Sequence, residues 1–385
     1  MKKRIKAGIL AALLCVCFAG AALCEADAYL YSYGGSEDDA LGGLAVSEDG
    51  QIVMAGYTNS SDGTLATRTK TGRSGWALCI DAQGNVLWSF CTRLGDHDLL
   101  RLPVWQADGS VVMVLEAEWL GTGAEEIELI RLDRNGEVAF RKTLEKSDGG
   151  EAKYVTLSHV TDEGYVVKRQ DAQARSTGSA LYGFDGELLR ELGPMPDGSV
   201  WARSAHHVLR DVDSKRVLFY IDEQGNEVEL EAETIPEAGR SRMGSDIDTL
   251  ISLPDGGAAG VGYAGEYESR KGLIVRWDAQ GNRVFEWWME GETALHSVIK
   301  TQGGYAALGE RAGTEPNSAA NWVLVTFDEN GVKRGSVVIG GSGYLSEGPR
   351  HLAQLPDGGF VAVKASGNML PRDVHVVIVP KEAVP

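Results

Sequence analysis

Cysteine is scarce in this chain, and most of it lies at one end. Three of the five cysteines precede residue 25, which leaves Cys79 and Cys91 for the remainder. Exported domains that depend on disulfides carry many more, so this composition excludes a disulfide scaffold. The turn pattern described below places these two residues on adjacent strands but out of register, which predicts two free thiols.

Long apolar runs are absent after the first 23 residues. The single run spans residues 7–23, follows four basic residues, and precedes small residues that end at Ala28. This order is typical of a secretory signal peptide. We therefore expect residues 1–28 to be removed and the mature chain to begin at Tyr29. Two alternatives are weaker: an uncleaved anchor would be short, and lipid attachment at Cys24 would need a small residue where a leucine stands.

Basic residues are in the minority. The chain has 37 Lys and Arg against 55 Asp and Glu, a formal net charge of −18. Such a surface repels nucleic acid and anionic lipid. We therefore expect no nucleic-acid partner, no membrane insertion after signal cleavage, and a secreted or extracytoplasmic location in the cell envelope.

Signatures of catalysis and metal binding are also lacking. No Gly-x-Ser-x-Gly nucleophile elbow occurs, and neither mature cysteine has an evident histidine partner. Seven histidines are scattered along the chain, and the adjacent pair His206-His207 would point to opposite faces of a strand. Turns of the Asp-x-Asn-Gly type match only half of a calcium loop. The sequence predicts no metal, no cofactor and no catalytic residue.

Glycine, by contrast, is abundant at 49 residues, and much of it falls in a repeated turn. The turn opens with Asp, which accepts backbone hydrogen bonds, and closes with Gly, which tolerates positive φ. Strand-like runs lie on both sides, so each copy predicts a β-hairpin. Copies begin at Asp81, Asp133, Asp185, Asp222, Asp278 and Asp328.

A second turn motif alternates with the first. Its copies end at Gly50, Gly109, Gly164, Gly198, Gly257 and Gly359, with a degenerate copy at Gly304. Two hairpin turns in each repeat of about 50 residues give four short strands per repeat, the pattern of a propeller blade. The sequence predicts one all-β domain over residues 29–385, a β-propeller of about seven four-stranded blades. The short fourth blade, residues 193–230, leaves six blades or an open array as alternatives.

The last repeat lacks its outer strand, and the N-terminus supplies a candidate. Residues 29–33 read Tyr-Leu-Tyr-Ser-Tyr, which matches the outer-strand pattern Val-Leu-Trp-Ser-Phe at residues 86–90. We expect this N-terminal strand to complete the last blade and to close the ring, because closure removes the exposed edges of an open array.

Residues 34–88 carry a family resemblance. Gly34-Gly35, Asp38-Asp39, Asp49-Gly50, the strand at residues 53–58 and the turn at residues 81–88 resemble one unit of the secreted bacterial β-propeller-repeat proteins. The resemblance covers nearly all of the mature chain and is poor in blades three and four. It implies a propeller fold and an extracytoplasmic setting, but little about activity. The outer strands are more distantly similar to quinoprotein-type propellers, although a quinone cofactor is not indicated.

Aligning the blades brings out one set of polar positions. Eleven residues before the turn glycine, four blades carry an acid at the entry to the innermost strand; histidine and arginine follow about four residues later. Two interpretations stay open: the acids cap the entry loop, or the set forms a polar channel mouth that binds a cation, a sugar or a basic peptide. The candidates are Asp39, Asp98, Arg101, Glu292, His296, Glu347, Arg350 and His351.

The tryptophans are weaker candidates for a binding site. Trp88, Trp277 and Trp287 recur at blade positions and are expected to be core between blades, whereas an exposed tryptophan elsewhere would suit carbohydrate stacking.

Together these patterns favour a non-enzymatic exported propeller that binds a protein, peptide or glycan through one face. The alternatives are a polysaccharide hydrolase or lyase that uses carboxylates at the channel mouth, and a structural module of the cell envelope.

Overall fold

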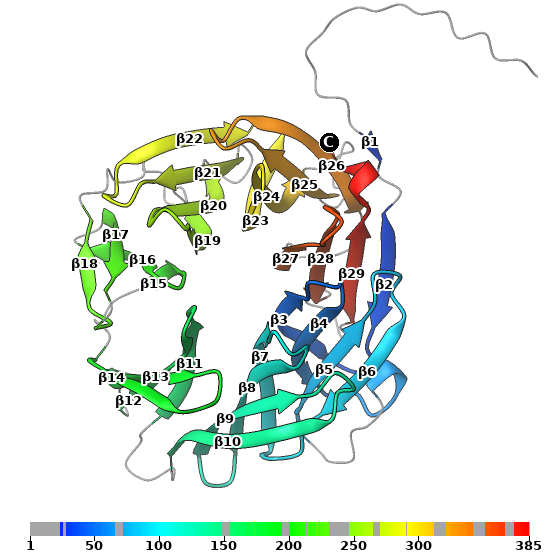
Figure 1. The fold of residues 1–385 in the computed structure, drawn as a ribbon, viewed down its shortest axis with the longest axis vertical. Helices are drawn as coiled ribbons and strands as arrows, with labels where there is room; N and C mark the ends of the chain where they lie inside the picture. The colour runs from blue at the N-terminus through cyan, green and yellow to red at the C-terminus, as the bar shows by residue number, and fades with distance from the viewer. Residues whose placement is uncertain are drawn as a thin grey trace, which may run out of the picture.

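The computed structural model describes residues 24–25, 28–65, 72–147, 154–171, 173, 175–194, 200–212, 215–222, 224–230, 246–264, 270–289, 291–311, 321–341, 351–365 and 373–384. Its strands form seven sheets arranged in a ring (Figure 1). The predicted all-β propeller of seven four-stranded blades is confirmed, including the short fourth blade.

Each blade is a sheet of four antiparallel strands, numbered here by position along the chain. Blade one holds β3 (Asp39–Val46), β4 (Ile52–Thr58), β5 (Ser74–Ile80) and β6 (Val86–Cys91); blade two β7 (His97–Trp105), β8 (Val111–Trp119), β9 (Ala124–Leu132) and β10 (Val138–Ser147); blade three β11 (Tyr154–Val160), β12 (Gly164–Gln170), β13 (Ser176–Gly183) and β14 (Leu188–Leu192). Blade four holds β15 (Val200–Arg203), β16 (His207–Val212), β17 (Lys215–Ile221) and β18 (Glu227–Glu229); blade five β19 (Asp246–Ser252), β20 (Ala258–Ala264), β21 (Lys271–Trp277) and β22 (Arg283–Met289); blade six β23 (Glu292–Thr301), β24 (Gly304–Arg311), β25 (Asn321–Phe327) and β26 (Lys333–Gly341). Blade seven holds β27 (His351–Gln354), β28 (Phe360–Ala365), β29 (Val374–Val379) and β2 (Tyr29–Tyr33).

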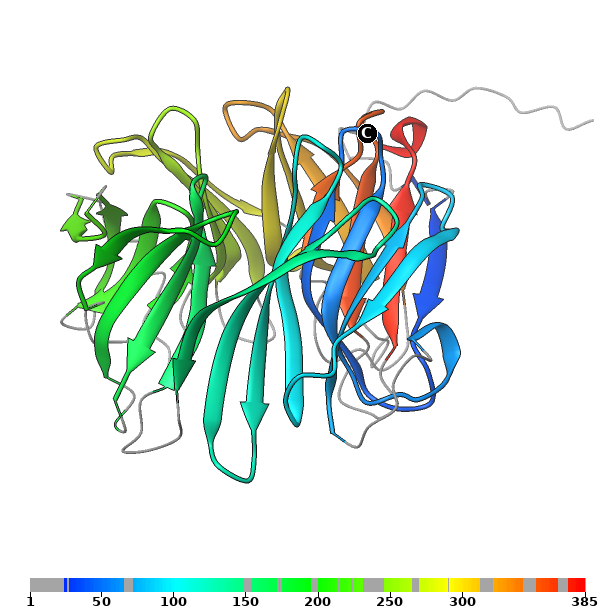
Figure 2. The same cartoon turned by 60° about the horizontal axis from the view of Figure 1, so that its bottom comes forward.

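The innermost strands β3, β7, β11, β15, β19, β23 and β27 face the middle of the ring (Figure 1). The other three strands of each blade lie progressively farther out, and neighbouring sheets stand side by side around the ring (Figure 2). Two short 3₁₀ helices, η1 (Gly63–Leu65) and η3 (Lys381–Ala383), and the two-residue strand β1 (Cys24–Glu25) complete the described elements. No helix among the described residues is long and apolar enough to cross a membrane.

The repeated turns have the local structure that their residues predict. In the first copy, the Asp81 carboxylate accepts the backbone N–H groups of Gln83 and Asn85, both at 2.8 Å. Gly84 has φ of +79°, the left-handed conformation that glycine tolerates. The same Asp-to-backbone bonds recur in the copies that begin at Asp133, Asp222, Asp278 and Asp328. Each of these turns therefore carries its own stabilising carboxylate.

The N-terminal strand β2 pairs antiparallel with β29, from Tyr29 opposite Ile378 to Tyr33 opposite Val374. It thus stands where an outer strand of blade seven belongs, as the sequence predicts. The phenol of Tyr33 also donates to the carbonyl of Gly84 in blade one at 2.7 Å. That the strand closes the ring stays a prediction.

The tyrosine at position 31 repeats a contact made by other outer strands. A Cβ atom at Gly84 would lie 2.3 Å from the Tyr31 ring, just as one at Gly136 would lie 2.7 Å from Trp88 of the preceding blade. Each aromatic residue therefore rests on the turn glycine of the next blade. The alignment of residues 29–33 with residues 86–90 is confirmed at the level of these contacts.

A two-residue strand, β1 (Cys24–Glu25), pairs parallel with β26. These two residues fall within the segment expected to be a signal peptide, and the pairing was not predicted. The remainder of that segment, except for Ala28, lies outside the described residues, so the cleavage site stays a prediction.

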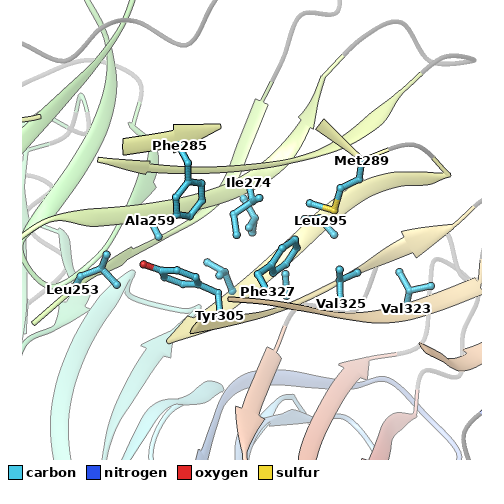
Figure 3. Close-up of a cluster of buried hydrophobic side chains, with 13 residues drawn as sticks. Leu253, Ala259, Ile274, Phe285, Met289, Leu295, Tyr305, Val323, Val325 and Phe327 are labelled. Atoms are coloured by element: carbon cyan, nitrogen blue, oxygen red, sulfur yellow. The ribbon is translucent and has the colours of Figure 1, made fainter. Parts of the chain in front are cut away.

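The core lies between blades rather than within one central mass. Figure 3 shows the cluster shared by blades five and six, where the rings of Phe285 and Tyr305 meet edge to face at 5.8 Å between centroids. Similar buried clusters join blades seven and one, one and two, two and three, four and five, and six and seven. Among the described residues, blades three and four share no such cluster.

Cysteine and tryptophan positions test two further expectations. Cys79 and Cys91 form no disulfide with each other, because Cys79 lies opposite Trp88 and Cys91 opposite Trp76. Trp88 and Trp277 are buried as predicted. The prediction for Trp287 was wrong: its side chain is exposed, and its indole N–H donates to the carbonyl of Asn330 in the next turn at 3.3 Å. The ring lies across the outer edge of the interface instead of inside it.

Candidate functional site

The acids at the entries of the first two inner strands are buried and hold their own loops. Asp98 accepts the backbone N–H groups of Leu94 at 2.9 Å and Gly95 at 2.7 Å, and the Thr92 hydroxyl at 2.7 Å. Asp39 accepts the N–H of Gly35 at 2.8 Å. Neither side chain is exposed to solvent. We therefore place both with the loop-capping interpretation and not in the candidate site.

His296 lies among carboxylates from neighbouring strands. Its Nδ1 is 2.6 Å from the carboxylate of Asp248 on β19, and its Nε2 is 3.8 Å from that of Glu310 on β24. Burial alone would lower the pKa of His296, but the two carboxylates outweigh it and raise the pKa to about 9. At neutral pH the imidazole is a cation that bridges blades five and six.

The remaining predicted residues are spread over several blades. Arg101 on β7 pairs with Glu116 on β8 at 3.0 Å, and His351 begins β27 with partial exposure. Glu292 begins β23, but its side chain is outside the described residues, as are Glu347 and Arg350 altogether. Among the predicted residues that the structure describes, Asp98 lines the cavity described next, and Arg101 is linked to it through its ion pair with Glu116.

A cavity of about 400 Å³ lies at the rim where β7 begins and β8 ends. Three glutamates line it: Glu116 and Glu118 from β8, and Glu125 from β9. Tyr57 from blade one and Tyr154 from blade three form part of its wall. The cavity thus joins three blades at the face from which the inner strands start.

Two of these glutamates are also structural. The Glu116 carboxylate accepts the backbone N–H of Leu157 at 2.8 Å, and Glu125 accepts that of Val155 at 2.8 Å. Both bonds tie blade two to the first strand of blade three. Glu118 differs, because its side chain is 48% exposed and its carboxylate lies 3.5 Å from His97. Glu118 is therefore the glutamate that a ligand reaches most readily.

The electrostatics of the cavity favour positive charge. Burial raises the pKa of Glu125, and the neighbouring carboxylates of Glu118 and Glu116 raise it further. Arg73 lies over the ring of Tyr57, 4.5 Å from its centroid, and so faces an aromatic surface. A cation bound among the three carboxylates would relieve their mutual repulsion.

The glutamate cluster was missed by the sequence analysis, because its members come from two strands and meet only through the fold. One signal was present: Glu116 and Glu118 alternate at the exposed end of a strand that is otherwise apolar. Residues two apart on a strand share a face, so the pattern places both carboxylates together.

A second cavity, of about 650 Å³, lies on the inner side of blades two to five. Its wall includes Arg101, His159, Arg203 and Ser252 from the four inner strands. Within the described part of the chain, no group of three or more His, Cys, Asp or Glu side chains is arranged to hold a metal ion.

Comparison with known proteins gives only distant structural similarities. No family model and no curated protein matches the chain. Among solved structures, it is similar to the β-propeller domain of the Trilobed protease from Pyrococcus furiosus, with 10% identity, a TM-score of 0.49, and coverage of 88% of this chain and 93% of that one. It is also similar to the NanB sialidase from Streptococcus pneumoniae, with 9% identity, a TM-score of 0.46, and coverage of 92% and 70%.

A puromycin hydrolase matches with 13% identity and a TM-score of 0.47 over 86% of this chain, which spans only 59% of that protein. The propeller fold rests on the strand pairing of this chain, and such a fold selects no activity, because propellers host many functions.

Proposed function

We propose that this protein is an exported, non-enzymatic binding propeller that holds a basic peptide segment at one face. The site is the rim cavity bounded by Glu116, Glu118 and Glu125. The observation that carries the proposal is the convergence of three carboxylates and two tyrosines on a cavity of about 400 Å³, a size within the ordinary range for ligand pockets.

The chemistry of the cavity matches a lysine or arginine side chain. Carboxylates supply charge-assisted acceptors for an ammonium or guanidinium group, and the tyrosine rings offer surface for its aliphatic stem. The overall charge of −18 would also attract a basic partner from a distance.

Binding of a fluorescein-labelled trilysine peptide, followed by fluorescence anisotropy, tests the proposal. Because Glu118 is exposed, Glu118→Gln should leave folding intact while it weakens binding by about fivefold to tenfold. Glu137→Gln, an exposed acid in an outer turn, is the matched control and should bind as the wild type does. Trilysine binding that ignores Glu118→Gln, or selective binding of neutral oligosaccharides instead, would contradict the proposal.

One observation favours a second function, the hydrolysis of a polysaccharide. The raised pKa of Glu125 suits a general acid, and Glu118 beside it would be the base or nucleophile. Release of reducing sugars from acidic and neutral polysaccharides, abolished by Glu125→Gln, would support this alternative. The hydrogen bond from Val155 to Glu125 favours a structural role for that carboxylate, so we rank the binding function first.

A further inference from the structure

The interface between blades three and four differs from the other interfaces of the ring. Each of the other six carries a buried apolar cluster, whereas the described residues of this one form none. In its place lies a cavity of about 460 Å³, lined by residues of both blades. His159, Asp162, Arg203 and His206 line this cleft and also the inner cavity of about 650 Å³, so the two spaces adjoin.

Arg203 is a largely buried cation on the wall that the two cavities share. Its side chain is only 12% exposed, and its Nη2 donates to the carboxylate of Glu227 at 2.8 Å. Glu227 also accepts two hydrogen bonds from Arg210, at 2.5 and 2.8 Å. A guanidinium has five N–H donors, and Arg203 uses one of them on a carboxylate that it shares. Arg203 also lines the cleft, so a ligand bound there would lie next to its guanidinium group.

Further donors surround the same space. Arg190 contacts Glu163 through Nη2, while its buried Nε has no hydrogen-bond partner. Burial lowers the pKa of His159 to about 3, and the nearby Arg203 and His206 side chains lower it further. At neutral pH the His159 imidazole is therefore uncharged.

The acidic side chains that line the cleft either bond to other protein groups or lie at its solvent-exposed side. Asp222 caps its own turn through the N–H groups of Gln224 and Asn226, and Glu163 pairs with Arg190. The side chain of Asp162 is 90% exposed and lies 3.5 Å from His206. The deep wall near Arg203 is consequently the part of the cleft that suits an anion.

An aromatic wall lies next to these donors. The rings of His206 and Tyr220 are stacked, with 6.5 Å between centroids and an angle of 30° between planes. Both residues line the cleft. A flat ring in the ligand would find a surface here, and its charged group would reach the arginine side of the wall.

We propose that the cleft between blades three and four binds a small carboxylate that carries a ring, with Arg203 holding the carboxylate and the His206–Tyr220 pair contacting the ring. Planar guanidinium and carboxylate groups match in geometry, and the His206–Tyr220 pair offers a surface to the ring of the ligand. This site takes an anion, unlike the rim cavity, and is independent of the proposed function.

A ligand-observed NMR titration of the purified protein with benzoate and benzamide tests the proposal. The two probes share a ring and differ in charge, so benzamide should bind at least about tenfold more weakly. Arg203→Gln should weaken benzoate binding by a similar factor, whereas Arg175→Gln, an exposed arginine outside the cleft in blade three, should have no effect. Circular dichroism checks that each variant is folded.

Other outcomes would overturn the assignment. These are the absence of saturable benzoate binding, equal affinity for benzamide, or benzoate binding that ignores Arg203→Gln. Inorganic phosphate that competes as well as benzoate would indicate an anion site without a ring subsite. If Arg203→Gln unfolds, Arg190→Gln and Tyr220→Leu serve instead, and affinity unchanged in both would reject the site. Glu118→Gln should not alter benzoate binding, which separates this test from that of the rim cavity.

Discussion

At the scale of single residues, a carboxylate in this fold has one of two roles, and burial decides between them. Both carboxylate oxygens of Asp98 accept hydrogen bonds from neighbouring N–H and O–H groups, whereas the carboxylate of Glu118 is exposed to solvent. An acid at the start of an inner strand looks the same in sequence in either role. The sequence therefore located Asp39 and Asp98 correctly at strand entries but could not show that they are enclosed. Glu125, which approaches Glu118 from another strand, could be found only with the fold known.

The environment of His296 predicts a pH dependence of stability. Its folded-state pKa of about 9 lies above the ordinary value near 6.5, so the protonated form stabilises the native state. That contribution is fully present below pH 6.5 and is lost as the pH rises through 9. We expect a loss on the order of 2–3 kcal/mol across this range.

Urea unfolding of the wild type and of His296→Gln, measured from pH 6 to pH 10, checks this prediction. The difference in unfolding free energy between the two proteins should shrink as the pH rises. A difference that stays constant over this range would show that the histidine is not charged in the native state.

At the scale of secondary-structure elements, a turn glycine meets two structural requirements: a positive φ and room for an aromatic ring of the preceding blade. Gly136 has φ of +81° and also receives the Trp88 ring of the preceding blade. The repeat predicted the first property, because Asp-x-x-Gly turns need positive φ. The second arises between blades and is invisible in one repeat. Short blade four was the hardest to predict, since β18 has only three residues and its neighbouring sequence departs from the repeat.

Substituting alanine at these glycines separates strain from contact. Gly136→Ala should lower the free energy of unfolding by about 2–4 kcal/mol, because it adds both left-handed backbone strain and a clash with Trp88. Gly123 has φ of +68°, and nothing lies within 4 Å of a Cβ added there. Gly123→Ala should therefore add backbone strain alone and lower the free energy of unfolding by about 1–2 kcal/mol. Chemical denaturation of both variants measures the difference. Equal losses would indicate that the aromatic contact contributes nothing.

At the scale of the whole molecule, the pairing of β2 with β29 joins strands from opposite ends of the propeller sequence. If this pairing closes the ring, removing residues 29–35 should lower the melting temperature sharply, because the outer face of blade seven and the contacts at Gly84 are lost together. Tyr29→Ala is the control, since that side chain is 56% exposed and points away from the core. Thermal unfolding monitored by circular dichroism reports both. A truncated protein as stable as the wild type would refute closure by this strand.

That pairing also has a kinetic consequence. The Ser32 hydroxyl and the His375 imidazole, 2.8 Å apart, are 343 residues apart in sequence. Loop closure over such a distance is entropically costly, and chains rich in non-local contacts fold slowly. During synthesis, the strand at residues 29–33 would emerge long before β29 and would stay unpaired, with its three tyrosines, until β29 has been made. Over that interval the protein would be an incomplete sheet with an exposed edge, and a chaperone that covers this edge would raise the yield of folded protein.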